Sequence, residues 1–204
     1  TANLNTAIGN FALKTTQNGC KNTAVGYQSM FDATSAECNV ALGAYSLANN
    51  TTADFNTALG TCSMFTNTTG ANNVAVGYNS LFSNTTGAIN TAVGAGALKS
   101  NTTGTSNVAV GCDALDSNTT GNENTIVGRE AGCSNTTGNC NTAVGSRSLK
   151  SNTEGFGNIA IGYHALCTNT TASVNTAIGF CAMQSNTTGA SNTAVGTNAL
   201  QENT

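Results

Sequence analysis

The chain has 204 residues, of which 7% are charged, and its net charge at pH 7 is −3. This charge provides no basic patch, so nucleic acid and anionic membrane surfaces are not expected partners, and no apolar run approaches the ~20 residues that a membrane-spanning helix needs. Apolar residues make up 39% of the chain, which argues against a disordered segment of low hydrophobicity and high charge.

A single pattern repeats without interruption from one end of the sequence to the other. With asparagine numbered as column 1 and glycine as column 5, twelve copies of N-T-A-V-G-x-x-A-L-x-x-N-T-T-G-x-x account for all 204 residues. The column-1 residues are Asn5, Asn22, Asn39, Asn56, Asn73, Asn90, Asn107, Asn124, Asn141, Asn158, Asn175 and Asn192. The column-5 residues are Gly9, Gly26, Gly43, Gly60, Gly77, Gly94, Gly111, Gly128, Gly145, Gly162, Gly179 and Gly196. An unbroken repeat predicts one continuous domain over residues 1–204.

Each repeat predicts a short strand followed by turns. Column 2 is Thr, Val or Ile and column 4 is Val, Ile or Leu, which is β-branched chemistry at period two. Columns 8 and 9, mostly Ala or Ser followed by Leu or Met, predict a second short inward-pointing piece, and columns 12–15 predict a turn. The expected fold is all-β: a single parallel β-solenoid, a β-roll or β-helix, with twelve coils of one repeat each, no caps, and rungs ~4.8 Å apart.

The charged residues predict which columns face solvent. All of them lie in columns 6, 7, 10, 11, 14, 16 and 17. We infer a core of columns 2, 4 and 9 with column 8 beside it. Alternation then places column 3, which is alanine except at Ile126, on the outside, where small side chains would let a second chain approach closely.

Stacking gives the asparagine and glycine columns structural roles. Equivalent asparagines on neighbouring rungs predict a hydrogen-bonded side-chain ladder. The column-5 glycine predicts a corner whose backbone angle a Cβ would forbid. Column 15 accepts both Gly and Ala, which predicts tight space rather than an obligatory positive φ.

Two motifs carry a resemblance to known repeats. The segments NVAVG (107–111) and NIAIG (158–162) resemble the head repeats of trimeric autotransporter adhesins, which carry a similar strand in a shorter repeat of a parallel β-roll. The longer segment NTAVGAGALKSNTTG (90–104) is similar to tandem repeats of phage and bacterial fibre proteins, some of which end in a self-cleaving chaperone domain. The resemblance covers all twelve repeats and implies a spacer or a binding surface.

The first and last residues continue the repeat in register when they are joined. A solenoid end normally carries an atypical cap, because an open rung exposes unpaired strand edges. We therefore expect either a stretch of a longer array or subunits that stack end to end in a filament.

The Asn-Thr-Thr phrase of columns 12–14 has two interpretations. Its side chains can hydrogen-bond the backbone of their own turn, or the asparagine can accept a glycan and the threonines O-linked sugars. The candidate glycan acceptors are Asn50, Asn67, Asn84, Asn101, Asn118, Asn135, Asn169 and Asn186.

The eight cysteines show no regular framework. Cys20 and Cys38 lie at neighbouring positions on adjacent rungs and are a candidate disulfide pair. Most of the cysteines are expected near the surface, either as free thiols or as inter-chain cross-links. No Cys/His cluster predicts a metal site, and no cofactor is expected.

The aromatic residues all fall in columns that also accept charge. Tyr163 and Phe180 share column 6 on adjacent rungs, as Phe65 and Phe82 share column 10. These pairs predict either stacking that stiffens the rod or contact with a neighbouring chain or a sugar. The single histidine, His164, has no carboxylate on its rung, so no catalytic residue is assigned and no enzyme is expected.

The leading functional hypothesis is a structural shaft or spacer of an extracellular or surface fibre, with an adhesive role as an extension. Self-association, end to end or lateral, and carbohydrate are the expected partners. The alternative is an ice- or polysaccharide-binding module that uses Thr arrays. Its weakness is that the threonines of columns 13 and 14 are adjacent, so that alternation turns one of them inward.

Overall fold

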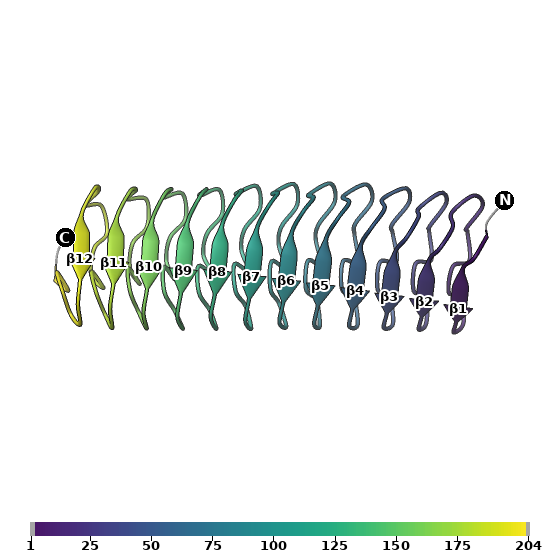
Figure 1. Cartoon of the computed structure of the whole chain (residues 1–204), viewed down its shortest axis with the longest axis horizontal. Coiled ribbons are helices and arrows are strands. Elements are labelled where there is room, and N and C mark those ends of the chain that lie inside the picture. Colours follow the sequence, from purple (N-terminus) through teal and green to yellow (C-terminus); the bar gives the residue numbers. More distant parts are fainter. Residues whose placement is uncertain (1–2, 203–204) are drawn as a thin grey trace.

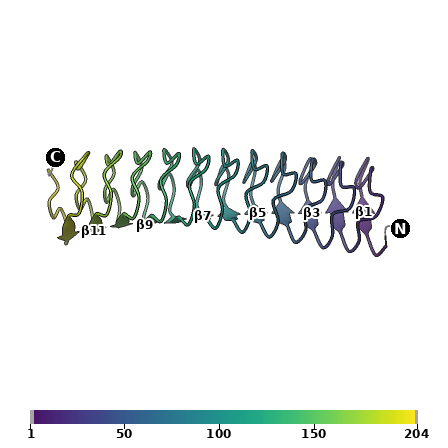
Figure 2. The same cartoon turned by 90° about the horizontal axis from the view of Figure 1, so that it is seen from above.

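Twelve short strands, one from each repeat, form a single parallel sheet along one side of a rod in the computed structural model, which describes residues 3–202 (Figures 1 and 2). The order of strands in the sheet is their order in the chain. The strands are β1 (Thr6–Ile8), β2 (Thr23–Val25), β3 (Val40–Leu42), β4 (Thr57–Leu59), β5 (Val74–Val76), β6 (Thr91–Val93), β7 (Val108–Val110), β8 (Thr125–Val127), β9 (Thr142–Val144), β10 (Ile159–Ile161), β11 (Thr176–Ile178) and β12 (Thr193–Val195).

The register of the sheet confirms one coil per repeat. Ala92 in β6 pairs with Ala109 in β7, and every other strand pair is likewise offset by one complete repeat. The backbone ladder continues beyond the strands, for example from Thr91 N to Asn107 O at 2.8 Å. Each rung therefore hydrogen-bonds the next through equivalent residues, and the predicted parallel β-solenoid is confirmed.

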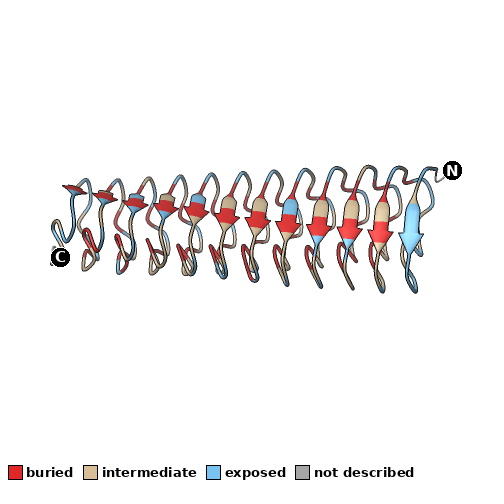
Figure 3. Ribbon diagram, turned by 60° about the horizontal axis from the view of Figure 1, so that its bottom comes forward, coloured by how far each residue is buried: buried red, intermediate tan, exposed pale blue. Residues whose placement is uncertain are grey.

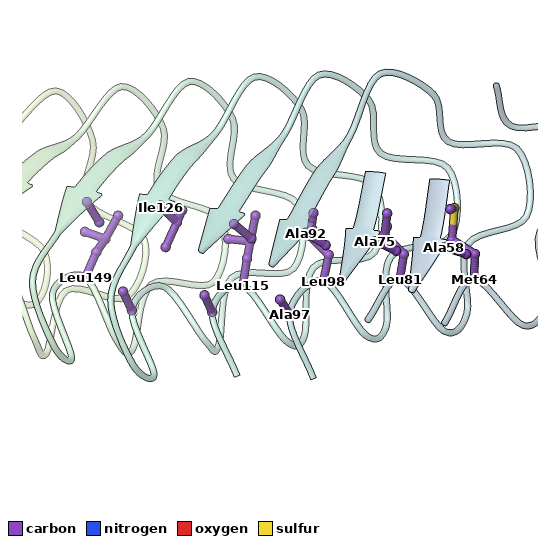
Figure 4. Close-up of a cluster of buried hydrophobic side chains, with 14 of the residues drawn as sticks. Ala58, Met64, Ala75, Leu81, Ala92, Ala97, Leu98, Leu115, Ile126 and Leu149 are labelled. Atoms are coloured by element: carbon purple, nitrogen blue, oxygen red, sulfur yellow. The ribbon is translucent and has the colours of Figure 1, made fainter. Parts of the chain in front are cut away.

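The prediction of which strand residues form the core is wrong. Column 3 is buried in β2–β12, whereas columns 2 and 4 are half-buried or exposed (Figure 3). The close-up in Figure 4 shows column-3 residues such as Ala75 and Ala92 beside the column-9 residues Leu81 and Leu98, inside the coil. Columns 8 and 9 do face inward as predicted.

The physical reason for this inversion is the small cross-section of the coil. Two inward β-branched residues per strand do not fit beside a leucine in so short a coil, whereas one alanine does. One repeat shows the constraint directly: it carries Ile126 in column 3 and Gly132 in column 9. A Cβ on Gly132 would lie 3.5 Å from two side-chain carbons of Ile126, so the isoleucine fills the space that column 9 fills elsewhere.

Two asparagine ladders run inside the coil. In column 1, the Asn107 amide N–H donates to Asn90 Oδ1 at 3.0 Å, and Asn107 Nδ2 donates to the Gly121 carbonyl at 2.8 Å. In column 12, Asn118 Nδ2 donates to Asn101 Oδ1 at 2.8 Å. The column-1 ladder is the one that the sequence predicts, and it is confirmed; the column-12 ladder is an addition.

The corner after each strand requires glycine for the predicted reason. Gly111 has a φ of +136°, and a Cβ there would lie 2.6 Å from the carbonyl oxygen of Gly128 on the next rung. Column 15 differs as predicted, because its glycines are crowded without a positive φ. Columns 7, 9 and 17 add an unpredicted feature, since their residues adopt left-handed backbone angles near +50° to +60° even when they are not glycine.

Candidate interaction surfaces

The outward side of the sheet is an uncharged strip, aliphatic in column 4 and mostly threonine in column 2, which we name the strand face. It consists of the column-2 and column-4 side chains of β1–β12: Thr, Val or Ile in the first column and Val, Ile or Leu in the second. Neither column contains a charged residue. Leu42 and Ile161 in column 4 are 39% and 38% exposed, which is high for large aliphatic residues in a sheet.

Aromatic residues cluster on a second surface, the turn face, formed by the outward residues of columns 6, 7 and 10. Over the first five repeats, ring centroids lie 6.3 Å apart for Phe11 and Tyr27, 5.2 Å for Tyr27 and Tyr45, and 6.2 Å for Tyr45 and Phe65. The predicted stacking of Phe65 on Phe82 is confirmed, with 5.3 Å between centroids and 8° between planes. A continuous row of rings thus crosses five rungs.

A second pair of rings lies farther along the turn face. Tyr163 and Phe180 stack as predicted, with centroids 5.4 Å apart and planes at 17°. His164 stacks on Tyr163 at 4.0 Å. Burial lowers the pKa of His164, and the nearby Arg147 and Lys150 lower it further, so the imidazole favours its neutral form.

Charged residues occupy the turn face between the two aromatic groups. Glu130 accepts hydrogen bonds from Arg147 Nε at 2.9 Å and Lys150 Nζ at 3.0 Å, and it also pairs with Arg129. The hydrogen bonds from Arg147 and Lys150 lower the pKa of the Glu130 carboxyl to about 2. The turn face therefore changes along the rod, while the strand face repeats.

The Asn-Thr-Thr turns are closed to the glycans considered above. All eight candidate acceptors lie among the fully buried polar residues. In each the side-chain amide is used internally: Asn101 Nδ2, for instance, donates to Asn84 Oδ1 at 2.8 Å and to the Gly104 carbonyl at 3.1 Å. The glycosylation alternative is therefore incompatible with the folded coil at Asn50, Asn67, Asn84, Asn101, Asn118, Asn135, Asn169 and Asn186.

The two threonines of the motif have different environments. Thr102 in column 13 is half-buried, and its hydroxyl donates to the Thr119 carbonyl at 3.0 Å. Thr103 in column 14 is exposed. Alternation thus turns one of the two adjacent threonines toward the coil, as the sequence predicts.

The cysteines are unbonded thiols in this structure. Cys38 N donates to Cys20 O at 3.0 Å, so the predicted neighbours do lie on adjacent rungs, although no disulfide joins them. Burial raises the pKa of the Cys20 thiol, and a hydrogen bond with Glu37 raises it further. Cys167 and Cys181 are buried, whereas the other six are half-buried or exposed, as expected for most of the cysteines.

A few buried polar atoms outside the ladders lack a hydrogen-bond partner within residues 3–202. They are Thr16 Oγ1, Asp116 Oδ1 and His164 Nε2, and the last two lie three rungs apart in the solenoid. Burial raises the pKa of the Asp116 carboxyl. No group of three or more metal-ligating side chains occurs in the described part of the chain. Likewise, residues 3–202 contain no helix with the length and hydrophobicity needed to cross a bilayer.

Comparison of the chain with protein-family models, curated proteins and solved structures found no match.

Proposed function

We propose that this chain is a rigid shaft or spacer in an extracellular or surface fibre, and that it presents its turn face to other molecules. The observation that carries the proposal is the continuity of the column-12 ladder. Its side-chain hydrogen bonds run from Asn50 to Asn186 without a break. A ladder of this length fixes the register of every rung that it joins.

The distribution of constant and variable columns supports a scaffold. Columns that face the interior keep one residue type or a close substitute, because each must match the rung above and the rung below. The outward columns of the turn face carry rings in some repeats and charges in others. Such a rod keeps its geometry while its surface changes along its length, as a spacer or adhesive shaft requires.

The extracellular location rests on the resemblance to adhesin and fibre repeats, and carbohydrate is the proposed partner of the turn face. Aromatic rings exposed in a row suit contact with the apolar faces of sugar rings. Phe11 and Tyr27, two neighbours in that row, are exposed at 46% and 43%, which leaves free ring surface for such a contact.

The test of the shaft is a change of length in whole repeats. Deleting residues 90–123 removes two complete repeats, so immunogold labelling should show a surface fibre that is shorter by ~10 Å but still assembled. Deleting residues 90–114, which does not preserve the period, should abolish the rod. Antibody label found only inside the producing cell or particle would refute the proposal, and so would equal tolerance of both deletions.

The contribution of the column-12 ladder to the stability of the shaft is tested separately with Asn118→Ala. The substitution removes two hydrogen bonds donated by Asn118 Nδ2 and one accepted from Asn135, so about 3 kcal/mol of stability should be lost. Asn49→Ala is the control, because that side chain is half-exposed and lies outside both ladders. Urea unfolding followed by circular dichroism measures both. Equal urea midpoints for the two variants would show that the ladder does not stabilise the rod.

The alternative of an ice-binding module gains one observation from the structure. Column-2 threonines such as Thr91 and Thr142 lie on the flat strand face, two residues from an aliphatic side chain, rather than in the Asn-Thr-Thr turn. A regular array of hydroxyl and methyl groups is the kind of surface that such a function needs. Thermal hysteresis and ice-crystal shaping by the purified chain would favour this alternative over the shaft.

A further inference from the structure

The strand face is a continuous uncharged strip along the rod: column 4 is aliphatic on every rung, and column 2 is threonine in eight repeats and Val or Ile in the other four. Eleven rung steps of ~4.8 Å give a length of ~53 Å, and two outward columns with their side chains give a width of ~10 Å. Its exposed members include Leu59, Val144 and Ile178, each at 37–39%. An exposed aliphatic row that runs the length of a rod is the kind of feature that marks an interaction surface.

The area of the strip is sufficient for a specific protein interface. A strip of these dimensions covers about 530 Å², so pairing two strips would bury about 1,060 Å² in total. This value reaches the ~1,000 Å² that separates specific interfaces from casual contacts. No charge would be desolvated, because columns 2 and 4 contain none.

The periodicity of the strip favours one kind of partner. Val93, Val110 and Val127 form a row with one aliphatic side chain per rung, and column 2 forms a parallel row of β-branched side chains, most of them threonine. A partner surface can interdigitate with these rows over the whole length only if it has the same rung spacing. A second copy of this chain has that spacing and the same uncharged rows of aliphatic residues and threonines.

We propose that two copies of this chain pair through their strand faces, sheet against sheet, with rows of column-2 and column-4 side chains interdigitating along the rod. Sheets packed in this way lie ~10 Å apart. The pairing rests on the proposed fibre function and specifies its partner: the shaft is a double rod whose turn faces point outward on opposite sides.

The test is the mass of the purified chain in solution. Sedimentation equilibrium is run in the presence of a reducing agent, which excludes cross-links through the free thiols. At high concentration it should give twice the chain mass of 20.4 kDa. The variant Val93→Lys with Val110→Lys places charges in the middle of the strand face. It should weaken self-association by a factor of about ten or more.

The matched control places the same two charges on the same two rungs outside the strand face. Thr103→Lys with Thr120→Lys changes exposed column-14 residues, so the pair should persist. Circular dichroism verifies that both variants keep the sheet. A wild-type chain that stays at 20.4 kDa, a mass of three or more copies, or equal dissociation of both variants would overturn the pairing.

The outcomes remain distinct from those of the length experiment. A monomeric rod that still shortens by whole repeats would refute the pairing and leave the shaft intact. A monomeric rod that shapes ice crystals would instead support ice binding by the strand face.

Discussion

Ile126 and Gly132 provide the sharpest test of how the coil is filled. Both depart from the consensus in the same repeat, and both lie in the interior. Ile126→Ala removes three buried carbons in a repeat where column 9 supplies none, so it should cost about 2–5 kcal/mol. Gly132→Leu inserts a side chain into the space of Ile126 and should cost about 1–3 kcal/mol.

The double variant restores the consensus of the other repeats. Leucine is accepted at column 9 with the same backbone, since Leu115 on the preceding rung has a φ of +56° and Gly132 has +54°. The double variant should therefore unfold within about 1 kcal/mol of the unchanged chain, which implies a coupling energy of at least about 2 kcal/mol.

Urea unfolding followed by circular dichroism measures all four proteins of this cycle. The slopes of the transitions must agree before the midpoints are compared, because repeat arrays can lose two-state behaviour. Costs that simply add in the double variant would show that columns 3 and 9 do not share one space. The assignment of column 3 to the core would then fail.

Three further predictions concern the backbone and charge of the coil. Gly111→Ala should cost about 2 kcal/mol or more by urea unfolding, because its Cβ meets the Gly128 carbonyl at a φ that alanine rarely adopts; an unchanged midpoint would contradict this. Val174→Asn should raise stability by about 0.5–1 kcal/mol, since asparagine tolerates the φ of +60° better than a β-branched residue; a lower melting temperature would count against it. The pKa of the Glu130 carboxyl should be about 2 by NMR titration, and Arg147→Ala should raise it. Because the folded pKa of Glu130 is depressed, the stabilisation from its ion pairs is complete above about pH 4.5 and is lost as the pH falls toward 2. A titration midpoint of Glu130 near 4.5 would show that these ion pairs are absent in solution.

The period of the sequence is sufficient to predict the architecture. In a chain without an insertion, stacking requires that each rung match its neighbours, so a constant spacing of Asn and Gly fixes the register of the whole sheet. The same logic predicts the column-1 ladder and the stacking of Phe65 on Phe82, because both follow from identical positions on adjacent rungs. The corner at column 5 follows from the intolerance of a Cβ there.

The direction of each side chain is harder to predict, because hydrophobicity alone misleads in a narrow coil. The β-branched and aliphatic residues of columns 2 and 4 predict an inward orientation, and the small side chains of column 3 predict an outward one with room for a partner. The paired exceptions at Ile126 and Gly132 indicate the true orientation, because a larger side chain in column 3 occurs together with a missing side chain in column 9. Such compensation occurs between residues that share a space.

The asparagine of the Asn-Thr-Thr phrase is ambiguous for a similar reason. A glycan acceptor and a ladder residue have the same letters, and only the side on which the turn faces distinguishes them. Asn118 is buried, and its Nδ2 donates hydrogen bonds to Asn101 Oδ1 and to the Gly121 carbonyl, which leaves no room for a sugar. The persistence of asparagine at Asn152, where Glu154 breaks the glycan motif, already favours the structural role.

The inversion of the strand has a consequence for what the rod can do. A coil that buries one alanine from each of the strands β2–β12, except for Ile126 in β8, gains little apolar burial from the sheet, so hydrogen-bonded ladders must supply the specificity of the interior. The column-4 aliphatic residues, which a wider coil would bury, remain outside in a straight row beside the mostly threonine row of column 2. Burying them against a second copy would add the missing hydrophobic stabilisation without altering a single rung. The narrow cross-section of the coil thus links the stability of the rod to its self-association. The variant that carries both Val93→Lys and Val110→Lys should therefore have a lower melting temperature than the unchanged rod, as well as a lower mass in solution.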